Sequence, residues 1–327
     1  MPYSKKILAS ADAIQAWRGA LMARGETVAL VAGTFDLFQP GNMLAIRRAA
    51  KLADRVAVWI EPDDPRGSAG ARTGCRNALD IRAEAAAYLK NVAAVIPGLP
   101  EHAEALRSLR PFTLVDCSAQ VEKGPGAIAA RPLAARTENL LPVGGCFTRD
   151  IARAVREGRT PIALPGHLQR VPEEDVGLEA LFRQRQGRKV KLVTINGCFD
   201  LLHIGHLRIL GQARLKGNRL IVLVNDDESV SRYKGPSRPV FPLVFRRTAL
   251  LMTEPVSIVM SFSGDNPLAE LGKIAPDVHV KGGSFEEARV MAERELVESK
   301  GGRLVMLPFV GGYSSTLLVQ SMKGCPQ

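Results

Sequence analysis

Apolar residues along this chain fall into short runs rich in valine and isoleucine, separated by segments with the spacing of amphipathic helices. In the first half the pattern predicts a helix, a strand, a helix and a strand at 10–24, 28–32, 44–53 and 56–60. The second half repeats this order at 175–185, 190–195, 206–216 and 219–225. Strands that alternate with helices form right-handed βαβ units and parallel sheets. The sequence therefore predicts an α/β fold with two tandem Rossmann-like domains.

Landmarks outside these elements also recur at a nearly constant distance along the 327 residues. The pairs are Gly33 and Gly197 (164 positions apart), Arg82 and Arg246 (164), Pro111 and Pro276 (165), and Gly144 and Gly311 (167). Because such landmarks in one order are hard to obtain by chance, the chain is interpreted as a duplication. We predict a first domain at 1–155, a proline-containing linker at 156–174 and a second domain at 175–327.

Composition narrows the class of protein. Hydrophobic residues make up 46% of the chain and charged residues 24%, as in soluble globular proteins. No run of 18 or more apolar residues occurs, so no membrane span is predicted. The five scattered cysteines form no CxxC pair and the N-terminus shows no apolar signal core, which favours a cytoplasmic location. The net charge of +11 is spread along the chain, which favours anionic small-molecule substrates over nucleic acid as partners.

The stretch from Gly197 to His206 carries the strongest chemical signal. It follows a predicted strand, at the end of the strand where α/β sheets bind ligands. Gly197 lets the backbone approach a phosphate, and Gly205 permits a tight start of the next helix, whose free N–H groups attract an anion. His203 and His206 are three residues apart, so both rings can face one phosphate and donate hydrogen bonds during in-line displacement.

Other interpretations of these residues stay open at this point. Two histidines at this spacing could bind zinc, although no third ligand with suitable spacing is evident. They could also be ordinary residues at the start of a helix. Asp200 is expected to orient the turn through backbone hydrogen bonds, with metal binding as its alternative role. Cys198 is expected to be a small packed residue, with nucleophile as its alternative role.

Six pieces of the second half carry a resemblance to a known family. They are Asn196-Gly197-Cys198-Phe199-Asp200, His203-Ile204-Gly205-His206, Val224-Asn225-Asp226-Asp227, Lys234-Gly235-Pro236-Ser237-Arg238-Pro239-Val240, Val280-Lys281-Gly282-Gly283 and Ser314-Ser315-Thr316. Residues 190–322 resemble the cytidylyltransferase-type nucleotidyltransferases with their HxGH motif, and most of all the adenylyltransferase domain of bacterial ADP-heptose synthase. The resemblance implies transfer of AMP from ATP to D-glycero-β-D-manno-heptose 1-phosphate, release of pyrophosphate, and Mg²⁺ on the triphosphate.

The same resemblance implies a role for each matching residue. His203 and His206 would stabilise the transition state at the α-phosphate, and Lys234 would bridge phosphates. The nucleotide would contact Asn196, Gly197, Cys198, Phe199, Gly205, Ser314, Ser315 and Thr316. The triphosphate or the acceptor phosphate would be held by Arg238, Arg246 and Lys281. Two alternatives accompany these roles: a solvated position for Lys281, and an N-cap for Ser315 and Thr316. Asp200 is the one carboxylate considered as a protein ligand of Mg²⁺.

The first half departs from this pattern. Gln39 and Asn42 replace the two histidines, Asp116 replaces the lysine of the Val-Lys-Gly-Gly piece, and the segment 67–73 has no lysine to match Lys234. The first domain is therefore predicted to be catalytically inactive and to act as a built-in partner, so that the protein is a monomeric pseudo-dimer or a homodimer. Because Gln39 and Asn42 can still form hydrogen bonds, weak nucleotide or effector binding is the alternative.

Three other functions compete with adenylyl transfer. The nearest is a CTP-dependent cytidylyltransferase acting on an alcohol phosphate of the phosphoethanolamine or glycerol phosphate type, where tandem domains of this kind also occur. A regulatory pseudoenzyme that binds nucleotide is a second, against which the intact second site argues. An aminoacyl-tRNA synthetase would share the literal His-Ile-Gly-His, but the chain has no Lys-Met-Ser-Lys loop. Val244-Phe245 and Ser284-Phe285 replace more polar residues of relatives, and we expect them to alter the acceptor pocket.

Overall fold

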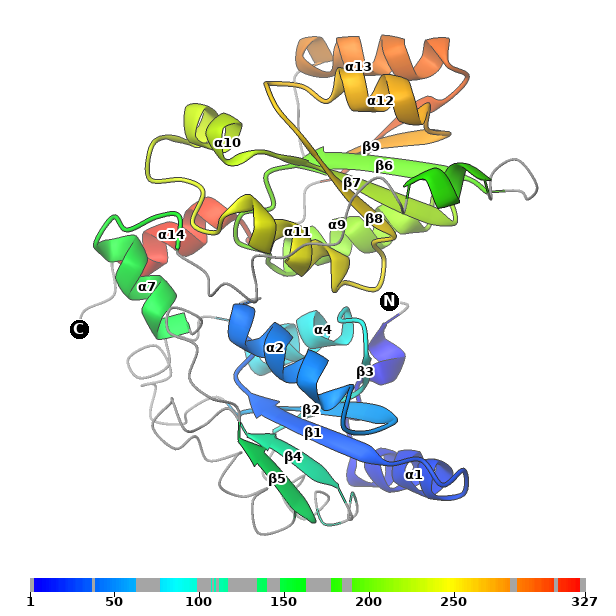
Figure 1. Cartoon of the computed structure of the whole chain (residues 1–327), viewed down its shortest axis with the longest axis vertical. Helices are drawn as coiled ribbons and strands as arrows, with labels where there is room; N and C mark the ends of the chain where they lie inside the picture. The colour runs from blue at the N-terminus through cyan, green and yellow to red at the C-terminus, as the bar shows by residue number, and fades with distance from the viewer. Residues whose placement is uncertain are drawn as a thin grey trace. The chain divides into compact units, whose positions relative to one another are not determined.

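The computed structural model describes residues 3–36, 39–62, 77–98, 107, 109, 112–116, 134–139, 148–162, 178–183, 190–282, 287–308 and 311–323. Its described residues form two compact units, one within residues 1–152 and one within 153–323. Each unit contains one five-stranded sheet whose neighbouring strands are all parallel (Figure 1). The prediction of an α/β fold with two parallel sheets is confirmed.

The first sheet has the strand order β3-β2-β1-β4-β5. Its strands are β1 (Val28–Gly33), β2 (Arg55–Ile60), β3 (Val92–Pro97), β4 (Thr113–Asp116) and β5 (Arg136–Asn139). The helices of this unit include η1 (Ser4–Lys6, a 3₁₀ turn), α1 (Ala11–Met22), α2 (Pro40–Ala49) and α4 (Leu79–Ala87). Leu30 on β1, Val58 on β2 and Ile96 on β3 are fully buried. Burial of this kind is expected for parallel strands that helices cover on both faces.

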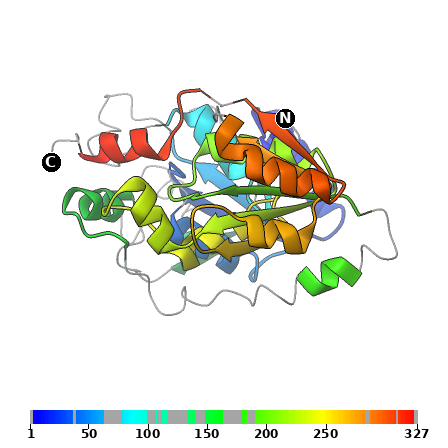
Figure 2. The same ribbon diagram turned by 90° about the horizontal axis from the view of Figure 1, so that it is seen from above.

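The second sheet has the strand order β10-β9-β6-β7-β8. Its strands are β6 (Leu192–Gly197), β7 (Arg219–Asn225), β8 (Ile258–Phe262), β9 (Val278–Gly282) and β10 (Arg303–Leu307). The named helices that follow β6 are α9 (Ile204–Arg214), α10 (Asp227–Lys234), α11 (Leu243–Leu251), α12 (Leu268–Ile274), α13 (Glu287–Ser299) and α14 (Ser315–Lys323). Helices α12 and α13 cover one face of the sheet, as Figure 2 shows from above, and α9 and α11 cover the other. In the described part of the chain, no helix is both long and apolar enough to cross a membrane.

The two units repeat one another element by element. Their strand orders correspond, and β1, α2 and α4 begin 164 positions before β6, α9 and α11. Phe35 and Phe199, also 164 positions apart, share a left-handed backbone with φ of 52° and 46°. Because bulky residues rarely adopt this conformation, its recurrence at one position supports duplication strongly.

The topology places a ligand-binding crevice beside β6. From this central strand the chain moves to one edge through β7 and β8, and then returns to the other side of β6 as β9 and β10. The strand order therefore reverses between β6 and β9, which are parallel neighbours. Open α/β sheets bind their ligands at such a switch point, outside the carboxyl ends of the strands.

The described part of the expected linker is attached to the second unit. The Oγ1 of Thr160 donates to the carbonyl of Ser237 at 2.8 Å, and the N–H of Ile162 donates to the carbonyl of Val240 at 2.8 Å. Helix α7 (Thr148–Arg156) spans residue 153, where the two units divide. Residues 163–174 of the expected linker lie outside the described residues. The boundaries at 155 and 175 stay a prediction.

Candidate nucleotidyl-transfer site

The two histidines meet at the start of α9. His203 is the N-cap residue of this helix, and its backbone N–H donates to Nδ1 of His206 at 3.4 Å. The two imidazole rings are stacked, with centroids 3.8 Å apart and an interplanar angle of 28°. The ring of Phe199 lies 5.2 Å from that of His206 and tilts against it. The helix begins two residues earlier than the sequence pattern suggests, because His203 itself is the residue that caps it.

Burial keeps both imidazoles neutral at pH 7. Burial and, to a smaller extent, the nearby positive charge of Lys234 together lower the pKa of His203 to about 4. The pKa of His206 lies well below its ordinary value, first through burial and then through the charges of His203 and Lys234. Lys234 is the last residue of α10, is exposed, and stands close enough to influence both rings. The structure thus brings together the three residues for which a catalytic role was expected.

The hydrogen bond to His206 fixes which nitrogen carries its proton. Nδ1 accepts the N–H of His203, so in the neutral ring the proton is on Nε2, which is the donor. The Nδ1 of His203 is buried and has no hydrogen-bond partner among the described residues. A buried polar atom without a partner costs about 1–3 kcal/mol.

These pKa shifts predict a pH dependence of stability. In the unfolded chain a histidine binds a proton near pH 6.5, whereas folded His203 does so near pH 4. Between these values the unfolded state holds more protons, so stability falls as the pH decreases from about 6.5 to 4. We expect His203→Gln to make the melting temperature fall less steeply between pH 7 and pH 5. Equal slopes for the variant and the wild type would contradict the depressed pKa.

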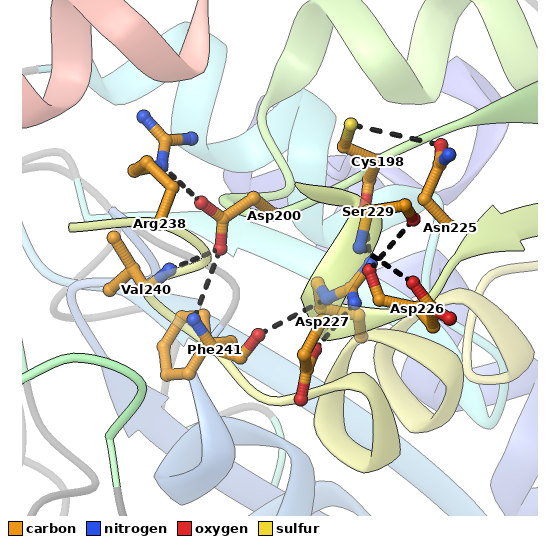
Figure 3. A network of polar contacts seen from close by, with 10 residues as sticks. Cys198, Asp200, Asn225, Asp226, Asp227, Ser229, Arg238, Val240 and Phe241 are labelled. Carbon is orange, nitrogen blue, oxygen red and sulfur yellow. Dashed lines mark hydrogen bonds and ion pairs between the residues drawn. The ribbon is translucent and has the colours of Figure 1, made fainter. Parts of the chain in front are cut away.

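Asp200 organises the loop that follows α10 (Figure 3). Its Oδ2 lies 2.5 Å from Nε of Arg238, and its Oδ1 accepts the N–H groups of Val240 at 2.7 Å and Phe241 at 3.0 Å. The Asp200 side chain has no exposed surface. Both carboxylate oxygens are therefore engaged within the protein, which supports the structural role expected for Asp200 and leaves it unsuited to bind Mg²⁺.

Arg246 is enclosed by protein oxygens. Its Nε donates to the carbonyl of Phe241 at 3.1 Å, its Nη1 to the carbonyl of Cys198 at 2.7 Å, and its Nη2 to Oδ1 of Asp227 at 2.7 Å. The side chain has no exposed surface. This geometry corrects the expected contact of Arg246 with phosphate, because its guanidinium already holds the turn after β6 against α10 and α11.

The first unit keeps this scaffold although it lacks the histidines. Arg82 donates from Nε to the carbonyl of Asn77 at 3.0 Å and from Nη1 to the carbonyl of Thr34 at 2.7 Å. The Oδ1 of Asp36 accepts the N–H of Asn77 at 3.0 Å. Each of these residues stands 164 positions before its counterpart in the second unit. The aspartate and arginine of the repeat therefore serve the fold in both units.

Unlike Arg246, Arg238 has a guanidinium nitrogen that forms no hydrogen bond with the described residues. Only 6% of its surface is exposed, and its Nη2 is buried without a partner among the described residues. Its Nε is paired with Asp200, which holds the guanidinium in place. The expected contact of Arg238 with a phosphate therefore stays a prediction.

Lys281 lies at the carboxyl end of β9 and is buried. Its Nζ contacts Oδ1 of Asn196 at 2.8 Å and the two carboxylate oxygens of Glu293 at 2.9 Å and 2.7 Å. Burial lowers the pKa of Lys281, and the charge of Glu293 opposes this effect. The alternative of a solvated lysine is therefore wrong. Sequence reasoning missed Glu293, because one glutamate on α13 gives no signal of its own among the other acidic residues of that helix.

The start of α14 packs against the turn before α9. Ser314 caps α14, since its Oγ accepts the N–H of Leu317 at 3.1 Å. The cap lies one residue earlier than expected, because Ser315 is buried and donates from Oγ to the carbonyl of Leu201 at 3.3 Å. Thr316 is exposed on the first turn of the helix. The positive end of a second helix dipole thereby lies close to the turn that carries His203.

Gly205 is needed because neighbouring side chains leave no room for a Cβ atom, and not because its backbone has a positive φ. A Cβ at this position would lie 3.0 Å from the ring of His203 and 3.2 Å from Cβ of Tyr313. Gly197 is similar, because a Cβ there would lie 3.1 Å from the ring of Phe199. The expected roles of both glycines in bringing the backbone close to a ligand stay predictions. Cys198 is half-buried and burial raises the pKa of its thiol, which suits a packed residue better than a nucleophile.

The second half of the chain is similar to known proteins. Residues 194–320 match the family model described as cytidylyltransferase-like. Residues 194–320, which include the two histidines, thus form a cytidylyltransferase-like domain.

The relatives of this domain include proteins named "Bifunctional protein HldE". The one from Methylococcus capsulatus is 41% identical over 167 residues, which are 50% of this chain and 35% of the relative. The one from Alkalilimnicola ehrlichii is 43% identical over 136 residues, 42% of this chain and 28% of the relative. The chain therefore spans well under half the length of these curated relatives. Among solved structures, the lipopolysaccharide core biosynthesis protein from Thermoplasma volcanium is similar with a TM-score of 0.33 and 20% identity, covering 38% of this chain and 99% of that one.

Proposed function

We propose that the protein is an adenylyltransferase that joins ATP to D-glycero-β-D-manno-heptose 1-phosphate and forms ADP-heptose and pyrophosphate. An oxygen of the sugar phosphate forms a bond to the α-phosphorus of ATP. The bond from that phosphorus to the oxygen bridging to the β-phosphate breaks, and pyrophosphate leaves with the electron pair. The observation that carries the proposal is the stacked, neutral His203–His206 pair at the start of α9, next to Lys234.

The proposed roles follow from charge. The N-terminus of α9 attracts the α-phosphate, and the imidazoles of His203 and His206 stabilise the negative charge that builds on its oxygens. Because the imidazoles are neutral, they act as hydrogen-bond donors rather than as cations. Lys234, exposed at the end of α10, supplies the mobile positive charge for the triphosphate. No general base is needed, since the attacking sugar phosphate is already ionised.

The identity of the acceptor rests on similarity in sequence. The pieces Lys234-Gly235-Pro236-Ser237-Arg238-Pro239 and Val280-Lys281-Gly282-Gly283 resemble those of bacterial ADP-heptose synthase, and the curated relatives match the same half of the chain. A cytidylyltransferase that acts on an alcohol phosphate is the second candidate, and the tandem arrangement of two similar sheets favours it. Motifs that bind phosphates do not select the base, so the substrate assay must distinguish the two.

We propose that Mg²⁺ is bound to the triphosphate of the nucleotide rather than to protein side chains. Among the described residues, no group of three or more His, Cys, Asp or Glu side chains could hold a metal ion. Asp200 has both carboxylate oxygens engaged in hydrogen bonds. Asp200 is therefore unsuited as a ligand of Mg²⁺, and the phosphates of the nucleotide would hold the metal. A zinc site at the two histidines lacks a third ligand in the same part of the chain.

Pyrophosphate release tests the proposal. The four nucleoside triphosphates are each combined with heptose 1-phosphate, phosphoethanolamine and glycerol phosphate, and release is followed with an excess of MgCl₂. We expect release with ATP and heptose 1-phosphate. Release with CTP and an alcohol phosphate would establish the second candidate instead. Absence of release with every pair would favour the third candidate, a nucleotide-binding regulatory pseudoenzyme.

The first unit is proposed to be an inactive partner of the second. Gln39 is the N-cap residue of α2, as His203 is of α9, and Asn42 stands where His206 stands, so the first unit lacks the pair of imidazoles. We expect a fragment of residues 153–327 to self-associate or to lose stability relative to the full chain. Sedimentation velocity and thermal melting of the fragment measure this. A stable monomer with full activity would refute the partner role.

A further inference from the structure

A buried polar network lies behind the proposed site and has no part in the phosphate chemistry described above. His279 connects Oγ1 of Thr194, at 2.8 Å from its Nδ1, to a carboxylate oxygen of Glu293, at 3.2 Å from its Nε2. Glu293 in turn holds Lys281, whose Nζ contacts Asn196. Thr194 and His279 have no exposed surface, and Glu293 exposes 4%. Burying so many polar groups is unfavourable unless each is paired. Because apolar residues of similar size often give equal or greater stability, we looked for a functional role of the network.

The first unit shows that the fold does not need this network. Leu30 and Ala32 stand 164 positions before Thr194 and Asn196, and Leu114 stands 165 positions before His279. Leu30 and Leu114 are fully buried, and the corresponding sheet has the same strand order. An apolar interior therefore supports the same architecture. Whereas the aspartate–arginine scaffold is present in both units, the network occurs in the unit that has the histidines.

The network ends at the switch point of the second sheet. Asn196 is the penultimate residue of β6, next to Gly197, and Lys281 is the penultimate residue of β9. The register pairs Ile195 with Val280, so Asn196 and Lys281 are neighbours one residue further along. Their contact therefore forms part of the floor where the loops after β6 and β9 diverge, which is the position of the ligand in open α/β sheets.

The lysine determines how the asparagine is oriented. A lysine ammonium can donate hydrogen bonds but cannot accept them, so Asn196 must turn its oxygen toward Lys281. The Nδ2 group with its two hydrogens then faces the other way, and no described residue accepts a hydrogen bond from it. Glu293 binds Nζ through both of its oxygens and so fixes the position of the lysine.

We propose that Lys281 and Glu293 are positioning residues that orient the amide of Asn196, whose Nδ2 donates to an acceptor oxygen of the bound nucleotide. The inference rests on the proposed nucleotidyl transfer and assigns to Lys281 an indirect part in place of the phosphate contact expected from the sequence. It also adds Glu293 to the residues on which nucleotide binding depends.

A comparison of three variants tests the proposal. Asn196→Ala removes the donor, and Lys281→Met combined with Glu293→Gln removes the support without leaving a buried charge unpaired. The third variant combines all three substitutions. We expect the Kd for ATP, measured by equilibrium dialysis, to rise about tenfold in each case, the loss of one hydrogen bond. The combined variant should bind no more weakly than Asn196→Ala, because the same hydrogen bond is lost. A combined loss of about 100-fold, as two independent contacts would give, overturns the proposal.

Thr194→Val is the matched control. It removes a hydrogen bond of the same network at the end remote from Asn196. We expect a lower melting temperature with the Kd for ATP unchanged. If this variant weakens ATP binding as much as the Lys281 and Glu293 pair, the network acts through general stability and the positioning role is wrong.

The two levels of the hypothesis fail in different ways. If the wild type binds ATP and the variants follow the expected pattern but no acceptor leads to pyrophosphate release, the proposed reaction fails and the positioning role stands. If the wild type releases pyrophosphate but the losses are additive, the reaction stands and the positioning role fails. A wild type that does not bind ATP overturns both.

Discussion

Replacing His203 by Gln or His206 by Asn is expected to lower the rate of pyrophosphate release by about 10²-fold or more, because an amide side chain does not keep its donor at the position of the imidazole N–H, and a misplaced transition-state donor acts much as a lost one. Each substitution introduces the residue that the first unit carries at the same position, Gln39 or Asn42. Because those residues already stand at the start of a folded helix, we expect the fold to be retained. The rate under saturating substrates measures the effect, and circular dichroism checks the fold.

The first unit supplies the control for this experiment. Asn42→Ala changes the residue that corresponds to His206 in the unit proposed to be inactive. We expect the rate of pyrophosphate release to be unchanged in this variant. If both histidine variants keep near-normal turnover, the second unit does not carry the catalytic site as proposed.

Asp200→Ala is expected to give the largest loss of stability. The substitution leaves the Arg238 guanidinium without its buried partner and removes the acceptor of two backbone N–H groups. Breaking a buried ion pair by removing one partner costs about 3–5 kcal/mol. Urea denaturation followed by far-ultraviolet circular dichroism measures the shift in the unfolding transition, because both tryptophans, Trp17 and Trp59, lie in the first unit and their fluorescence would not report on the second.

An exposed ion pair provides the comparison for Asp200. Glu228 and Arg232 are 2.9 Å apart on α10, and their side chains are 82% and 50% exposed. Such pairs contribute about 0–1 kcal/mol, so Glu228→Gln should barely move the transition. If Asp200→Ala and Glu228→Gln have similar small effects, Asp200 does not organise the loop after α10 as its contacts indicate.

Local patterns in the sequence are sufficient to predict the architecture. The alternation of apolar runs and helical segments is a property of short windows, and it predicts the parallel sheets. The duplication follows from landmarks such as Gly33 and Gly197, whose spacing does not depend on tertiary structure. Helix starts were less accurate: α2 begins at residue 40 instead of 44, because Pro40 already lies in its first turn.

Residue roles were harder to predict where the partners are distant in sequence. The sequence indicated a phosphate contact for Arg246, but its partners Cys198, Asp227 and Phe241 enclose it completely. A basic residue in a family motif looks the same in sequence whether it contacts a ligand or supports the turn that does. Ser314 is similar, since the serine run alone does not show which hydroxyl caps α14.

The duplication, the α/β class and the histidine turn of the second half can be predicted from the amino-acid sequence without a structure. These features depend on the order of residues within short segments, such as the glycine turn that joins a strand to a helix. The tertiary structure decided which polar residues face a ligand and which support the fold. Asp200 meets Arg238 across 38 positions, Lys281 meets Asn196 across 85, and Ser315 meets Leu201 across 114. The physical reason is that burial and hydrogen-bond partners are set by the packing of distant segments, which no local pattern specifies.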